Sequence, residues 1–68
     1  MKKVTSLFEL ADKAATDPKY LKLALIASSN LGGPKDTLQS ALRWLHINAS
    51  ETDEEGVVDE INFCRDLI

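Results

Sequence analysis

Residue types that commonly carry catalysis or hold metals are scarce in this chain of 68 residues, which has one cysteine, Cys64, and one histidine, His46. A single cysteine excludes an internal disulfide framework and suits a reducing compartment. A zinc site or a Cys–His catalytic pair would need both residues and further partners from distant parts of the chain. The sequence therefore predicts a protein that is not an enzyme and that binds no cofactor and no metal.

Long apolar runs are also missing. No stretch is long enough for a signal peptide or a membrane-spanning helix. Glycine and proline are few, and the Gly32-Gly33-Pro34 segment lacks the spacing of a phosphate-binding loop. With 44% hydrophobic and 28% charged residues, the chain has the composition of a single folded domain over residues 1–68. We expect a cytoplasmic protein with no membrane contact.

The pattern that is present throughout the chain is that of helices. Apolar residues recur three and four positions apart in four segments, near residues 7–16, 18–31, 34–48 and 53–66. Each segment has its own start or stop signals, which are the capping box Ser6–Glu9, the pair Asp17-Pro18, Gly32 followed by Pro34, and the capping box Thr52–Glu55. The sequence predicts an all-α fold, a compact four-helix orthogonal bundle.

The second segment differs from the others because its apolar residues cover most of the helix circumference. These residues are Tyr20, Leu21, Leu23, Ala24, Leu25, Ile26, Ala27 and Leu31. Only a narrow polar strip near Lys22 and Ser29 is left between them. A helix that is apolar nearly all round is buried on several sides. We expect this segment to be the central buried helix of the bundle.

Four large apolar residues fall outside the expected core stripes. Trp44 and Ile47 lie roughly opposite the stripe that contains Leu38 and Leu45, and Phe63 and Leu67 lie to one side of the stripe in the last segment. They either pack under another helix of the same chain or anchor a partner, which is a common role of exposed aromatic residues. The second alternative predicts a small interaction module, a regulator or inhibitor that binds another protein or a second copy of itself through these four residues.

Charge is distributed unevenly along the chain. Residues 1–50 contain seven basic and four acidic residues, whereas residues 51–68 contain seven acidic residues and one basic residue. The balances of +3 and −6 add to the net charge of −3. The acidic end is either a solvated cap on the last helix or a surface that binds a partner. The basic residues could form the stripe typical of nucleic-acid binding only if the last helix packs on the far side.

One segment carries a local resemblance to a known family. Leu31, Gly32, Lys35, Thr37, Leu38, Leu42 and Ile47 occupy the pattern positions of the helix-turn-helix in Fis-type DNA-binding domains, which residues 31–47 resemble. The segment departs from that pattern at Gly33, where an apolar residue is usual, and at Ser28, where alanine is usual. The resemblance implies the alternative function, a dimeric DNA-binding transcriptional regulator whose DNA-facing residues are Lys35, Gln39, Ser40 and Arg43.

Overall fold

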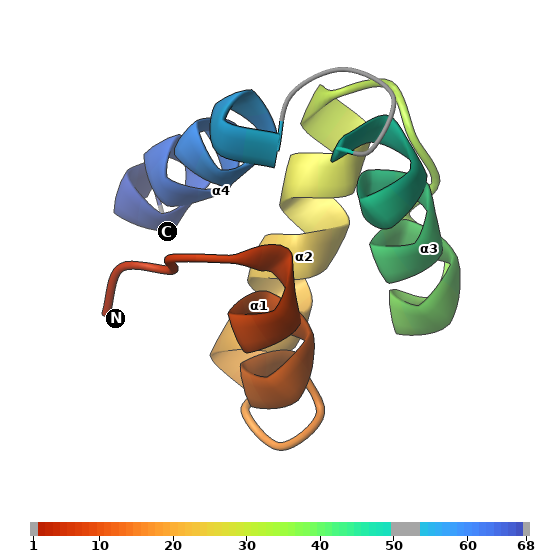
Figure 1. The fold of residues 1–68 in the computed structure, drawn as a ribbon. Helices are drawn as coiled ribbons and strands as arrows, with labels where there is room; N and C mark the ends of the chain where they lie inside the picture. The colour runs from red at the N-terminus through yellow and green to blue at the C-terminus, as the bar shows by residue number, and fades with distance from the viewer. Residues whose placement is uncertain (1, 50–53, 68) are drawn as a thin grey trace.

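A computed structural model describes residues 2–49 and 54–67 of the chain. These residues form four helices, α1 (Leu7–Ala14), α2 (Pro18–Asn30), α3 (Leu38–Asn48) and α4 (Glu54–Leu67), and no strand occurs among them. The predicted all-α class is confirmed. In Figure 1, α2 lies in the middle of the molecule with α4 and α3 on opposite sides, and it packs against each of the other three helices.

Three helices begin where a side-chain oxygen accepts a hydrogen bond from a backbone N–H of the first turn. Ser6 accepts from Glu9, and Asp17 accepts from Lys19, as the sequence predicts. The third helix begins at Leu38, not at residue 34, because Thr37 is its N-cap and accepts from the N–H of Ser40. The predicted start was therefore four residues too early. The capping box predicted at 52–55 begins outside the described residues.

Two glycines close the end of α2. Gly32 has a φ of +94°, and its N–H donates to the carbonyl of Ser29. The N–H of Gly33 donates to the carbonyl of Ser28 at 2.7 Å. This pair of bonds is a Schellman motif, which satisfies carbonyl groups that the last helical turn leaves unpaired. The left-handed C-cap that the sequence predicts at Gly32 is confirmed.

The connection between α2 and α3 spans residues 31–37 and is longer than predicted, because the sequence places the start of the third helix near residue 34. The carbonyl of Pro34 accepts a hydrogen bond from the hydroxyl of the buried Ser28. In a helix starting at residue 34 this carbonyl would instead accept from the N–H of Leu38. Ser28 thus holds the connection against α2, and helical structure begins only after it.

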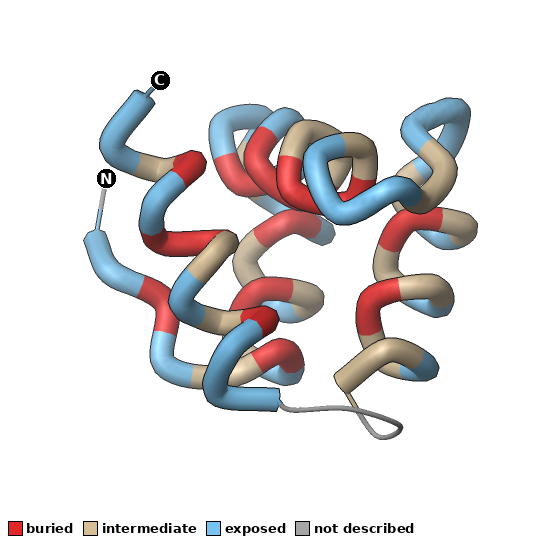
Figure 2. The backbone as a smooth tube through the Cα atoms, turned by 90° about the horizontal axis from the view of Figure 1, so that it is seen from above, coloured by how far each residue is buried: buried red, intermediate tan, exposed pale blue. Residues whose placement is uncertain are grey.

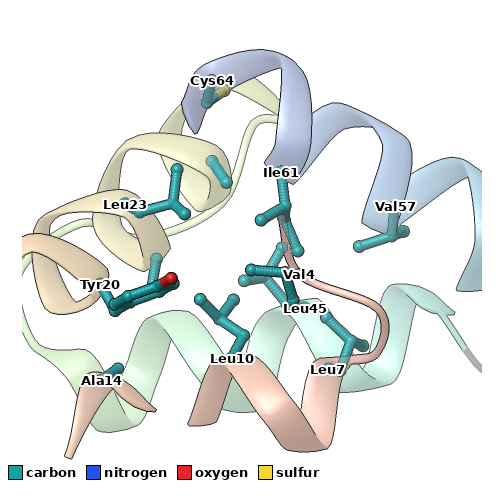
Figure 3. Close-up of a cluster of buried hydrophobic side chains, with 12 residues drawn as sticks. Val4, Leu7, Leu10, Ala14, Tyr20, Leu23, Leu45, Val57, Ile61 and Cys64 are labelled. Atoms are coloured by element: carbon teal, nitrogen blue, oxygen red, sulfur yellow. The ribbon is translucent and has the colours of Figure 1, made fainter. Parts of the chain in front are cut away.

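The core receives side chains from all four helices (Figure 3). Its largest fully buried helical residues are Leu7 and Leu10 of α1, Leu23 of α2, Leu45 of α3, and Ile61 and Cys64 of α4. In Figure 2, buried and exposed stretches alternate along the helices, because each helix turns one face toward the interior. A single small core of this kind is what a chain of this length can build.

The second helix is central but keeps one open face. Tyr20, Leu23, Ala24 and Ala27 are buried as predicted. Leu21 and Leu31 are exposed, and Leu25 and Ile26 are only half-buried. The second helix is therefore buried on several sides, as expected, and its remaining apolar side chains lie on the part of its circumference that the three neighbouring helices leave uncovered.

The N-terminal strap, residues 2–5, is part of the core although it is not helical. Val4 is 1% exposed and lies among core side chains in Figure 3. The side-chain amide of Asn62 in α4 donates to the Val4 carbonyl and accepts from the Val4 N–H, both at 2.8 Å. The hydroxyl of Tyr20 donates to the carbonyl of Lys2 at 3.0 Å. The strap is thereby fixed to both α2 and α4.

Candidate protein-binding surface

The most exposed apolar pair that the sequence singled out lies on α4. Phe63 is 60% exposed and Leu67 is 67% exposed. They are four residues apart, which places them side by side on one face of the helix. The buried residues Val57, Ile61 and Cys64 occupy another face and hold α4 to the core. We call Phe63 and Leu67 the α4 stripe.

Acidic residues flank the α4 stripe. Asp59 and Glu60 precede Phe63 by four and three positions, so both lie one helical turn from its ring. Asp59 is exposed and Glu60 is partly exposed. Asp66 is also exposed and forms an ion pair with Arg65, with 2.6 Å between Nη2 and Oδ1. The stripe is therefore an apolar surface with a negatively charged border.

Trp44 and Ile47 of α3 have different surroundings from each other. Trp44 is half-buried, packs against the core and lies over Gly33. A Cβ added to Gly33 would collide with the six-membered ring of the indole and would lie 2.7 Å from the hydroxyl oxygen of Ser28. The indole thus occupies the space next to residue 33, where the Fis-type pattern has an apolar side chain. Ile47, by contrast, is 46% exposed.

The structure does not gather the four predicted binding residues on one surface. Trp44 and Ile47 belong to α3, and the C-terminal half of α4, which carries Phe63 and Leu67, points away from α3 in Figures 1 and 2. The α4 stripe and Ile47 are exposed, whereas the indole of Trp44 mainly contacts its own chain. The candidate surface is therefore centred on α4.

One exposed aromatic residue was missed by the sequence reasoning. Phe8 of α1 is 79% exposed, and its ring lies 5.5 Å from the ring of His46 in α3, tilted by 56°. The available signal was its position, because Phe8 falls outside the apolar stripe formed by Leu7, Leu10 and Ala14. Edge-on and tilted ring pairs of this kind are favourable contacts. Phe8 and His46 form a second, smaller exposed contact between α1 and α3.

A shallow open groove lies on the uncovered face of α2. Its lining residues are Lys22, Leu25, Ile26, Ser29, Asn30 and Lys35. All but Lys35 belong to α2, and Lys35 comes from the connection to α3. The amide of Asn30 also donates to the sulfur of Cys64 at 3.2 Å, which ties one edge of the groove to α4. We call this the α2 groove.

Cys64 and His46, the two residues considered for catalysis, both make contacts within the fold. Cys64 is buried in the core, and burial raises the pKa of its thiol while the hydrogen bond from Asn30 opposes that shift. A thiol with a raised pKa is protonated at neutral pH and is a weak nucleophile. His46 contacts Phe8. No group of three or more residues suited to binding a metal ion occurs among residues 2–49 and 54–67.

The residues implied by the helix-turn-helix resemblance occupy two elements. Gln39 and Arg43 are exposed and lie one turn apart on the outer face of α3. Ser40 is only partly exposed, and its backbone N–H donates a hydrogen bond to the hydroxyl oxygen of Thr37. Lys35 precedes α3 by three residues and lies in the connection. The structure therefore places Gln39 and Arg43 together and leaves Lys35 outside the helix.

Comparisons with protein-family models, with curated proteins and with solved structures found no match to this chain. Across the part of the chain that the structure describes, none of the helices has both the length and the apolar character needed to span a membrane.

Proposed function

We propose that this chain is a non-enzymatic protein-binding module that regulates or inhibits its partner, and that the α4 stripe is the centre of its binding surface. The observation that carries this proposal is the exposure of Phe63 and Leu67, at 60% and 67%, on one helical face. Burying a side chain of this size stabilises a protein by about 1.5–3 kcal/mol. In this domain, which has a small core, both side chains remain exposed to water on the same face of α4. Exposed apolar patches are typical of interaction sites.

The border of the stripe supports the same proposal. Interfaces commonly have an apolar centre surrounded by a polar rim. Asp59, Glu60 and Asp66 provide that rim on α4. Because these residues are acidic, they favour a partner surface that carries basic residues. The acidic end of the chain then has a role in choosing the partner, beyond keeping the last helix solvated.

A photo-crosslinking experiment tests the proposal. A photoreactive phenylalanine analogue replaces Phe63 in one variant and Phe8 in a matched control, and both variants are irradiated in cells. We expect a discrete adduct from position 63 that disappears when Leu67→Ser is added, and none from position 8. The absence of an adduct from position 63, or the same adduct from both positions, would contradict the proposal.

DNA binding is a second candidate function, favoured by one observation. Gln39 and Arg43 are both exposed one turn apart on α3, the helix that follows the glycine-containing connection 31–37. Side chains so placed on an exposed helix face can reach base edges in the major groove. Under this candidate, the purified protein binds duplex DNA at low salt, and Arg43→Ala weakens that binding without lowering the melting temperature. A protein that shows no binding to mixed duplexes at low salt eliminates it.

A further inference from the structure

The α2 groove is suited to binding an amphipathic helix that carries apolar side chains next to acidic ones. Leu25 and Ile26 give it a half-buried apolar floor. Lys22 and Lys35 are exposed at its border and supply two positive charges. An occupant that complements this groove therefore needs large apolar side chains next to carboxylates, because complementary charge selects partners and fixes their orientation.

The α4 stripe has these properties. Phe63 and Leu67 are exposed apolar side chains, and Asp59 and Glu60 lie one turn before Phe63. The chain does not fill its own groove with this stripe, because no groove-lining residue belongs to α4 and both stripe residues are largely exposed. A second copy of the same chain therefore carries a surface that matches the groove in both apolar character and charge.

Two copies can make this contact twice. Each chain has one groove and one stripe, so a two-fold arrangement lets each stripe enter the groove of the other chain. A stable interface buries about 800 Å² per partner, which is about a fifth of the 4275 Å² surface of this chain. One stripe in one groove is a small contact, and the reciprocal exchange doubles the buried area.

We propose that the α4 stripe of one copy binds the α2 groove of a second copy and that the chain forms a symmetric homodimer in this way. This inference rests on the proposed function, because it uses the same stripe, and it names the partner. It also gives roles to Lys22 and Lys35, which neither the core nor the candidate binding surface on α4 uses.

Charge reversal followed by mixing tests the proposal. The groove variant is Lys22→Glu with Lys35→Glu, and the stripe variant is Asp59→Lys with Glu60→Lys. Each variant alone presents like charges at both contacts, whereas a mixture presents opposite charges at both. We expect sedimentation equilibrium to show a dimer for the unchanged chain. For each variant alone, the dissociation constant of the dimer is expected to be at least ~10-fold higher. The equimolar mixture is expected to form the dimer again.

Two controls keep the result specific. Lys2→Glu with Lys3→Glu changes the net charge as much as the groove variant does, at exposed residues outside the groove, and is expected to leave the dimer intact. Phe63→Ala changes no charge and is expected to weaken the dimer as much as the stripe variant does. Circular dichroism establishes that every variant keeps its helices, and Asp59→Lys alone replaces the stripe variant in the mixing experiment if the double variant does not fold.

The outcomes separate this inference from the proposed function. An unchanged chain that stays monomeric up to millimolar concentration overturns the homodimer, as does a mixture of variants that fails to recover it. If the chain is monomeric but the photoreactive group at position 63 still captures a different protein, the proposed function stands and the homodimer alone is refuted. If neither association nor an adduct is found, both are refuted.

Discussion

The connection between α2 and α3 and the N-terminal strap are both irregular segments held by buried polar groups, but they are held over different distances along the chain. In the connection, the carbonyl of Ser28 accepts a hydrogen bond from the N–H of Gly33, five residues away, and its hydroxyl donates to the carbonyl of Pro34, six residues away. In the strap, Val4 bonds to Asn62, which is 58 residues away. The first arrangement follows from a local pattern of glycine, proline and a helix end. The second depends on how the whole chain folds.

The strap is the segment where a single substitution is expected to have the larger effect. In Asn62→Ala, the N–H and carbonyl of Val4 either stay buried without partners, at about 1–3 kcal/mol each, or the strap detaches and exposes Val4. We expect the free energy of unfolding to fall by about 2–4 kcal/mol in urea titrations. Hydrogen exchange at the Val4 amide separates detachment from global unfolding.

A matched control is available on the same helix. Asp59→Ala removes an exposed side chain of the same size as Asn62 from α4 and leaves the strap in place, so it is expected to cost much less than Asn62→Ala. If Asn62→Ala costs no more than this control and the Val4 amide exchanges as slowly as before, Asn62 does not hold the strap.

The connection is expected to respond more weakly, and by a different mechanism. In Gly33→Ala the new Cβ collides with the indole of Trp44 and with the Ser28 hydroxyl. Overpacking of this kind costs about 1–3 kcal/mol. We expect the effect to shrink in a Trp44→Leu background, because the smaller side chain leaves room for the Cβ, so that the two substitutions are not additive. Equal costs of Gly33→Ala in both backgrounds would show that Trp44 does not restrict residue 33.

The smallest effect is expected where the strap meets α1. The Thr5 hydroxyl donates to the carboxylate of Glu9, and this hydrogen bond lowers the pKa of Glu9. A lowered pKa in the folded state gives stability that is present above the pKa of the unfolded chain and is lost as the pH falls through the folded value. The unchanged protein should therefore lose slightly more stability between pH 6 and pH 3 than Thr5→Val does. Because Glu9 is partly exposed to solvent, the difference will be small, and identical pH profiles would contradict the role of Thr5.

What could be predicted from the sequence follows the same division between near and distant contacts. Ser6, Asp17 and Gly32 were correctly assigned to helix ends, because capping uses residues within one turn of each other. The start of α3 was misplaced because Thr37 competes with Pro34 as a start signal, and the contact from Ser28 to Pro34 decides between them.

The candidate surface was predictable only in part. Phe63 and Leu67 lie to one side of the apolar residues expected to be buried on α4, a position that indicates exposure, and both are exposed. Trp44 has the same signature on α3, yet its indole packs against Gly33, because the connection returns over that face of the helix. The α2 groove was not predicted, since an apolar helix surface gives no sign of which side its neighbours leave open. Periodicity identifies a face, and only the packing of the chain determines what covers it.

Backbone and indole NMR spectra recorded from 10 μM to 2 mM test the central claim, that α4 and not Trp44 provides the binding surface, most directly. We expect the resonances of Phe63 and Leu67 to shift with concentration, together with those of Lys22 and Ile26 in the α2 groove, while the indole N–H resonance of Trp44 stays constant. Shifts centred on the Trp44 indole, with Phe63 and Leu67 unchanged over the whole range, would contradict the claim.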